Sequence, residues 1–205
     1  MIATTILGLL GPRLAHITAQ PNLPLIKREG LKSAASLAAD VGPASTLLRK
    51  DRRVVGHAIL NHQLPLASHY RTAERLLEGH TPESWAAQLD RRVFFATEAF
   101  AAKFRASFND VQPVTLWLDT QVLLSQMVDQ MWLCPLNSGS FRQGGGKKPR
   151  GDWIYVSASS DVETYRNNRL NRGVVKSPDT KVKEVSITAP VPAALLSEAL
   201  ISIDE

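Results

Sequence analysis

The segment from Lys181 to Thr188 carries the clearest strand signal in the chain, because polar and apolar residues alternate along it from about Lys183 onward. Successive side chains of a strand point to opposite faces. One face is expected to hold Val182, Glu184, Ser186 and Thr188, and the other Lys183, Val185 and Ile187. A carboxylate beside valines is unusual, although a charge on an edge strand is the ordinary alternative. Glu184 is therefore a candidate functional residue.

Strand and helix signals alternate along the rest of the chain. Thr81-Pro82, for example, marks a helix start, with Thr81 as N-cap and proline at the first helical position. Residues 44–90 carry helical signals with charged faces, and 135–151 reads as a long loop. With no internal repeat and no clean linker, we expect one α+β domain over residues 1–205. Strands are expected at 14–18, 92–97, 113–119 and 153–156, and helices at 1–11, 22–30, 33–38, 98–108, 120–130 and 191–203.

The composition is that of an ordinary globular protein, with 44% hydrophobic and 21% charged residues among 205. A single cysteine, Cys134, allows no internal disulfide, which suits a reducing compartment. The opening residues lack a positively charged start, and no apolar stretch approaches the ~18 residues of a membrane span. The sequence therefore predicts a cytoplasmic protein without a membrane partner.

Basic residues concentrate in the second half of the chain. The net charge is +5, and between Leu136 and Lys183 ten Lys or Arg face four Asp or Glu. Such an excess permits a nucleic-acid partner, while a solvated surface is the plainer interpretation. The candidate nucleic-acid-binding residues are Arg142, Lys147, Lys148 and Arg150.

Several common catalytic patterns are absent from the sequence. Gly144-Gly-Gly146 precedes two lysines but has no strand-to-helix frame, so it is not a phosphate-binding loop. One cysteine and five histidines form no zinc spacing, so we expect no metal.

Three motifs remain besides Glu184. His16-Ile-Thr18 ends a short apolar strand, with Asn22 close behind, although a lone histidine is more often structural. Arg91-Arg92 precedes Val-Phe-Phe95, where a surface salt bridge is the alternative. The turn Asn137-Ser138-Gly139 either presents backbone donors to a ligand or merely turns the chain.

In their order along the chain, these motifs resemble the DarT-type DNA ADP-ribosyltransferases. The similarity lies in His16-Ile-Thr18, Asn22-Leu-Pro24, Ile26 and Gly30 at the start, and in Lys183-Glu184-Val185 followed by Val191-Pro192 at the end. Arg91-Arg-Val-Phe-Phe95 and Pro135-Leu-Asn-Ser-Gly139 also resemble a group of uncharacterised bacterial proteins with the same His-x-Thr opening.

The resemblance implies a split, bent pair of antiparallel sheets, with helices inserted between strands and NAD held in the cleft as substrate. Glu184 would be catalytic, near the nicotinamide ribose. The residues implied to contact NAD are His16, Thr18, Asn22, Phe95, Asn137 and Ser138, with Phe94 and Tyr155 as alternatives to Phe95 for stacking on nicotinamide. The acceptor would be a nucleic-acid base, single-stranded nucleic acid being the expected partner, or a protein side chain. The protein would then be a toxin or defence factor, with an antidote protein as a further partner.

The sequence departs from the DarT pattern in one respect. That pattern carries an arginine soon after its second strand, whereas here the corresponding place reads Ala96-Thr97-Glu98. Arg92, which lies before the strand, is the candidate for that catalytic role. The alternative is a non-catalytic module on the same fold, which binds nucleic acid or a protein through its basic region.

Overall fold

The computed structural model describes residues 2–42, 48–108, 110–142 and 148–205. Its main element is a seven-stranded sheet in the order β7-β6-β8-β4-β1-β5-β9, in which every neighbouring pair is antiparallel. A separate hairpin pairs β2 (Arg53–Val55) with β3 (Ala58–Leu60). The strands of the main sheet are β1 (Arg13–Ala19), β4 (Val93–Thr97), β5 (Pro113–Asp119), β6 (Met131–Cys134), β7 (Val156–Ser157), β8 (Glu184–Ile187) and β9 (Leu200–Asp204).

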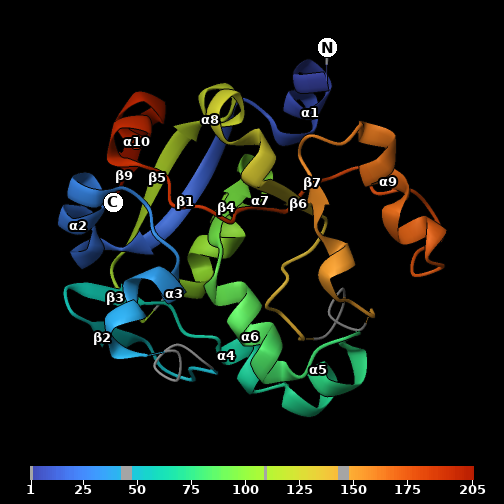
Figure 1. Ribbon diagram of the computed structural model, residues 1–205, viewed down its shortest axis with the longest axis horizontal. Coiled ribbons are helices and arrows are strands. Elements are labelled where there is room, and N and C mark those ends of the chain that lie inside the picture. The colour runs from blue at the N-terminus through green and yellow to red at the C-terminus, as the bar shows by residue number, and fades with distance from the viewer. Residues whose placement is uncertain (1, 43–47, 109, 143–147) are drawn as a thin grey trace.

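The helices are short and cover both sides of the sheet. In Figure 1, α1, α8 and α10 lie along the top of the view, and α4, α5 and α6 lie together at the bottom. The α-helices are α1 (Ile2–Leu10), α2 (Leu23–Glu29), α3 (Ala34–Leu37), α4 (Leu64–Ala67), α5 (Tyr70–Leu76), α6 (Pro82–Asp90), α7 (Glu98–Arg105), α8 (Thr120–Met127), α9 (Val162–Asn171) and α10 (Ala193–Ala199).

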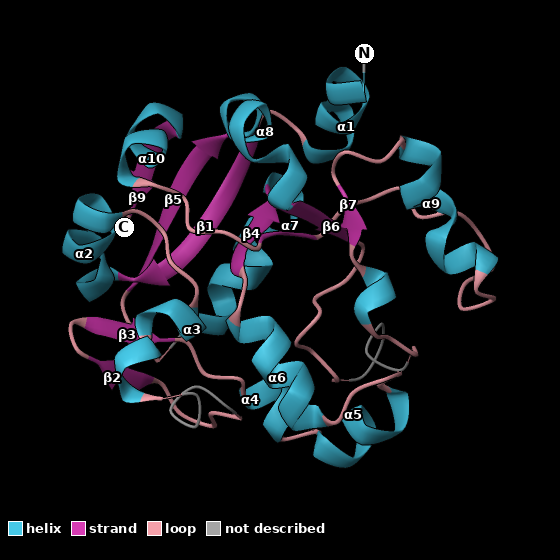
Figure 2. Cartoon of the chain, viewed as in Figure 1, coloured by secondary structure: helices cyan, strands magenta, loops and turns pink. Residues whose placement is uncertain are grey.

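The main sheet divides between β1 and β4. These strands share only two register pairs, Leu14 with Thr97 and Ala15 with Ala96, whereas β1 and β5 share seven. Beyond Ala15, β1 continues beside β5, and the first half of β4 continues beside β8. Figure 2 shows the long arrows of β1 and β5 together, apart from the shorter β4, β6 and β7. The sheet is therefore two groups of strands joined by a short shared stretch.

The largest apolar cluster lies on one face of this sheet. Phe95, Val185 and Leu133 occupy neighbouring strands there, in one cluster with apolar side chains of α1, α8 and α10. The opposite face carries Glu184, because side chains alternate along a strand and Glu184 precedes Val185. A second cluster, centred on Trp85 of α6, covers that face around Cys134. Each side of the sheet therefore has its own helical cover.

Many predicted elements are confirmed. The expected strands near 14–18, 92–97 and 113–119 are β1, β4 and β5. Thr81 caps α6 through a reciprocal pair of hydrogen bonds with Ser84, one of which joins the Ser84 N–H to Thr81 Oγ1 at 3.2 Å. The alternation around Glu184 predicts β8, although the strand is shorter than 181–188. Gly30, expected to end α2, does so at a φ of 81°.

Other predictions are wrong. Within the region 44–90, where helical signals were expected, Arg53 to Leu60 instead form the β2–β3 hairpin, and the helices α4, α5 and α6 follow it. The expected strand 153–156 is mainly a 3-10 turn, in which the Tyr155 N–H donates to the Asp152 carbonyl, and only Val156–Ser157 pair with β6. The expected helix 191–203 ends at Ala199, because Leu200–Asp204 pair with β5 and sheet pairing overrides helical propensity.

Candidate functional site

Glu184 stands at the start of β8, in a row of residues that crosses four adjacent strands. Cys134, Glu184, Ala96 and Ala15 face one another in register across β6, β8, β4 and β1. The side chain of Glu184 is only 4% exposed. The backbone N–H of Ser138 donates to its Oε2 at 3.4 Å, and its Oε1 has no hydrogen-bond partner among the described residues. A buried carboxyl with one unused oxygen is uncommon, since buried polar atoms are usually paired.

The surroundings of Glu184 favour its protonated form. Burial raises the pKa of Glu184 to about 7, although hydrogen bonds from Ser138 and the positive charges of Arg92 and Arg150 act in the opposite direction. Burial likewise raises the pKa of the Tyr155 hydroxyl and of the Cys134 thiol, and Glu184 is the second cause for both. The site therefore holds one carboxyl that titrates near neutral pH, beside two groups that stay protonated.

Arg92 lies on the same face as Glu184. Its Nη1 donates to Ser186 Oγ at 3.1 Å, and Ser186 shares the Glu184 face because it is two residues further along β8. The guanidinium carbon lies 3.9 Å from the centre of the Tyr155 ring and 5.8 Å from that of Trp132. The structure thus brings both predicted catalytic residues, Glu184 and Arg92, to one site. Tyr155 was only an alternative in the sequence and Trp132 was missed, because a tryptophan in a hydrophobic segment carries no distinctive signal.

The Asn137-Ser138-Gly139 turn closes over this site. Besides the bond from Ser138 N–H to Glu184, the turn receives a hydrogen bond from Trp85 Nε1 to the Ser138 carbonyl at 3.2 Å. The predicted presentation of a backbone donor is present in the structure, but its acceptor is Glu184 of the same chain.

His16 lies where β1 and β4 part. Its Nδ1 is 2.9 Å from the Phe94 carbonyl oxygen, which can only accept, so Nδ1 carries the proton. Its ring is 5.7 Å from that of Phe95. Burial lowers the pKa of His16, so the imidazole is neutral at pH 7. Ala15 shares the Glu184 face, two strands away at roughly 10 Å between backbones, and His16, the next residue, points to the opposite face with Phe95.

Thr18 and Asn22 are held in a separate network further along the chain. Asn22 Nδ2 donates to Thr18 Oγ1 and to the Ile59 carbonyl, both at 3.0 Å, and the Ile59 N–H donates back to Asn22 Oδ1 at 2.7 Å. Both side chains are buried. In this structure they join β1 to the β2–β3 hairpin, and their side-chain hydrogen bonds go to each other and to Ile59.

The two phenylalanines of β4 point to opposite faces. Phe95 is 2% exposed and belongs to the main apolar core, on the face away from Glu184. Phe94 and Tyr155 instead contact the cluster around Trp85 on the Glu184 face. Of the three candidates for stacking on nicotinamide, Phe94 and Tyr155 are therefore the better placed.

The predicted nucleic-acid-binding residues do not form one surface. Arg142 and Lys148 are exposed, and Lys147 lies outside the described residues. Arg150 is fully buried, and its Nη1 donates to the carbonyls of Asn137, Ser138 and Ser140 at 3.0–3.2 Å. In this structure Arg150 faces backbone oxygens where a phosphate was expected.

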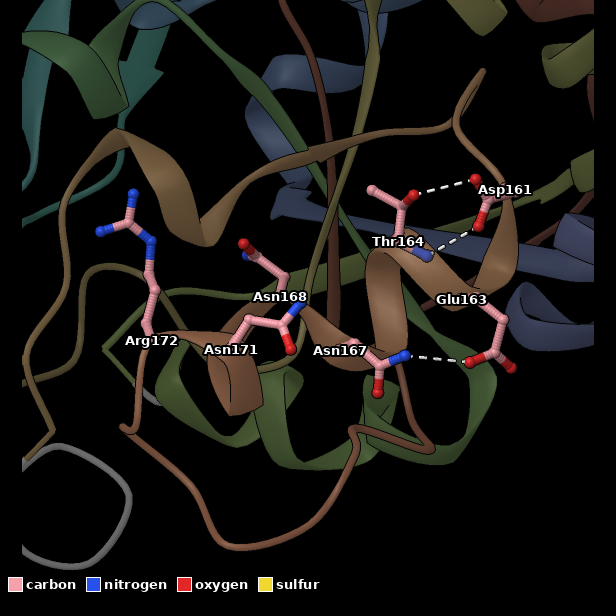
Figure 3. A pocket seen from close by; sticks show the side chains of 7 residues that line it. All are labelled: Asp161, Glu163, Thr164, Asn167, Asn168, Asn171 and Arg172. Atoms are coloured by element: carbon pink, nitrogen blue, oxygen red, sulfur yellow. Dashed lines mark hydrogen bonds between the residues drawn. The ribbon is translucent and has the colours of Figure 1, made fainter.

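A polar hollow lies along α9, away from Glu184. Its volume is about 440 Å³, and Figure 3 shows Asp161 at one end and Arg172 at the other, with Asn167, Asn168 and Asn171 between. Asp161 caps the helix by accepting from the Thr164 N–H at 2.7 Å. In the parts of the chain that the structure describes, no three His, Cys, Asp or Glu residues gather as metal ligands. Within the same ranges, no helix has the length and hydropathy needed to span a bilayer.

The structure defines an α+β protein with an antiparallel main sheet that carries a buried carboxyl on β8. Residues 12–197 match the family of unknown function DUF7002, so the chain belongs to this family. The matched span includes every motif from His16 to Glu184. No curated protein matches the sequence.

Proposed function

We propose that this protein is an NAD-dependent ADP-ribosyltransferase in which Glu184 is the catalytic carboxylate. The observation that carries the proposal is the free oxygen of Glu184, buried on β8 next to the point where β4 parts from β1. The resemblance of the His16, Asn22 and Glu184 motifs to DarT-type enzymes supports the same assignment, and the divided sheet is compatible with the split sheet pair that the resemblance implies.

The chemistry suits a carboxylate of this kind. Transfer breaks the bond between C1′ of the ribose and the nicotinamide nitrogen, and positive charge develops on the ribose as nicotinamide departs with the bonding electrons. A nearby anion stabilises that charge by preorganised electrostatics. Glu184 Oε1 is free to accept a hydrogen bond from the ribose 2′-hydroxyl, which would fix the orientation of the sugar. The acceptor then bonds to C1′ and loses its proton.

The neighbours of Glu184 have supporting roles in this proposal. The Ser138 N–H fixes one carboxylate oxygen and leaves the other for the sugar. Arg92 supplies positive charge on the same face, and the Tyr155 ring lies against that guanidinium at 3.9 Å. Because Glu184 is only 4% exposed, we expect side chains over it to move aside when NAD binds, while the Ser138 N–H keeps its bond to Oε2.

The acceptor is proposed to be a nucleic-acid base or a protein side chain, as in a toxin or defence factor. Arg142 and Lys148 are exposed cations close in sequence to the turn that covers Glu184, and are suited to phosphate contacts. If they guide nucleic acid, the double variant Arg142→Gln/Lys148→Gln should weaken binding to single-stranded DNA and RNA and flatten its salt dependence.

Thermal unfolding with and without millimolar NAD tests the cofactor assignment. The wild type and the control His57→Ala, an exposed histidine in the hairpin turn, should be stabilised, whereas His16→Ala should lose the shift. No shift in the wild type would contradict the proposal. It would favour the alternative, a non-catalytic module, which a salt titration with nucleic acid would then examine.

A further inference from the structure

The least expected placement in this structure is that of Arg150, a fully buried arginine at the end of the basic loop. Its Nη1 donates to Asn137 O at 3.2 Å, Ser138 O at 3.2 Å and Ser140 O at 3.0 Å. Its guanidinium carbon lies 4.3 Å from the centre of the Phe141 ring. These three hydrogen bonds and the ring contact all join Arg150 to residues 137–141.

The backbone of Arg150 is fixed independently of its side chain. The Arg150 N–H donates to the Leu76 carbonyl at 2.9 Å, and the Glu78 N–H donates to the Arg150 carbonyl at 2.8 Å. These bonds attach the residue to the C-terminal end of α5. The guanidinium therefore extends from an anchored backbone to the turn.

The 137–140 turn contacts Glu184 through the Ser138 N–H. The peptide that carries the Ser138 N–H begins with the carbonyl of Asn137, one of the three oxygens that Arg150 binds. A peptide unit is rigid and planar, so fixing this carbonyl also fixes the direction of the N–H. Converging carbonyl dipoles would repel one another without a cation between them, and the planar guanidinium also lies against the Phe141 ring, a contact that the compact ammonium of lysine does not reproduce.

We propose that Arg150 is a positioning residue, which holds the 137–140 turn so that the Ser138 N–H stays directed at Glu184 and Oε1 is left free. It thereby deepens the proposed function, since it gives that reaction a residue that acts through the catalytic carboxylate without touching NAD. The inference rests on the proposed function only for the task of Glu184, because the contacts themselves need no NAD.

The ionisation of Glu184 reports directly on this arrangement. The titratable and charged groups that face it are Arg92 just before β4, Cys134 from β6, Tyr155 and Arg150 itself. A backbone N–H directed at a carboxylate favours its charged form. Loosening the turn removes that bond, so the pKa of Glu184 should rise further.

The test is NMR titration of the glutamate side-chain carboxyl carbons, with the Glu184 signal assigned by its loss in Glu184→Gln. Arg150→Lys keeps the charge but loses the planar group that lies against Phe141, and should raise the Glu184 midpoint by roughly 1 pH unit. Arg49→Lys is the matched control, because Arg49 is also buried but pairs with Asp90 at 2.6 Å. The Glu184 midpoint in Arg49→Lys should match that in the wild type.

A folded Arg150→Lys with an unchanged Glu184 midpoint would overturn the inference. If Arg150→Lys does not fold, Phe141→Leu decides, since it removes only the ring against the guanidinium and should give a smaller rise in the same direction. An unchanged midpoint in Phe141→Leu would then overturn it. These titrations contain no NAD, so their result does not depend on whether the protein is a transferase. The inference about Arg150 and the proposed function can therefore fail independently.

Discussion

The backbone N–H of Ser138 donates to Glu184 Oε2 across 3.4 Å, and so joins a loop turn to a strand 46 residues further along the chain. This bond occupies one carboxylate oxygen and leaves Oε1 without a partner among the described residues. A structural role alone would be served better by a carboxyl with both oxygens paired, because unpaired buried polar atoms cost free energy. The relationship therefore favours a functional role for Glu184.

Glu184→Gln should change how the free energy of unfolding depends on pH. Burial raises the folded-state pKa from 4.5 to about 7, so the folded protein holds this proton more tightly than the unfolded chain. The contribution of Glu184 to stability is complete below about pH 4.5 and is lost as the pH rises through 7. Glutamine carries no charge, so the variant should be the more stable protein at pH 8, by ~3 kcal/mol. Urea unfolding at pH 5 and 8 measures the difference.

The control for that experiment is Glu98, whose pKa is shifted in the opposite direction from that of Glu184. Glu98 is ion-paired with Arg13 at 2.6 Å, and this bond lowers its pKa. Glu98→Gln should therefore give no gain in stability at pH 8. A Glu184→Gln variant that is also no more stable at pH 8 than the wild type would show that Glu184 is not held in an unfavourable charged state.

Asn22→Ala should destabilise the protein whether or not NAD is present. The substitution leaves the Ile59 N–H and carbonyl without their side-chain partner, at a cost of about 2–3 kcal/mol. Asn167→Ala on α9 removes an exposed amide that donates to Glu163, and should stay within about 0.5 kcal/mol of wild type. Loss of NAD binding without loss of stability in Asn22→Ala would contradict the structural role and support direct contact with NAD.

Gly30→Ala should cost clearly more stability than Gly11→Ala. Both glycines have positive φ, 81° and 79°, which strains alanine at either position, and the ψ of −166° at Gly30 adds to the strain there because that combination is nearly restricted to glycine. A Cβ at Gly30 would lie 2.0 Å from the Val191 carbonyl oxygen, whereas one at Gly11 meets nothing within 4 Å. The difference in free energy of unfolding should be about 2 kcal/mol or more. Equal costs would mean that α2 and the segment after β8 do not pack this closely.

Local patterns in the sequence account for part of this structure. Alternation predicted β8 and the face that Glu184 shares with Ser186, and turn chemistry predicted the start of α6 at Thr81. Both depend on neighbours within a few residues. Leu200–Asp204 also alternates, but only its pairing with β5 makes it a strand, and that partner is distant in sequence.

The candidate site was predictable only in its residue types. Glu184 and Arg92 could be selected from their motifs, and the structure places both on one face. The choice between Phe94 and Phe95 depends on strand register, which the sequence does not contain. Arg150 looked like a surface cation, because burial of an arginine requires acceptors that come together only in the folded chain.

Release of nicotinamide from NAD, measured for the wild type and for Glu184→Gln between pH 5.5 and 8.5, tests the central claim most directly. We predict that the wild type releases nicotinamide, with a rate that rises as Glu184 loses its proton around pH 7. Glu184→Gln should be slower by roughly a hundredfold or more, since the anion that stabilises the ribose charge is gone. Equal rates in the two folded proteins, or no release by the wild type in the presence of nucleic-acid and protein acceptors, would contradict the account.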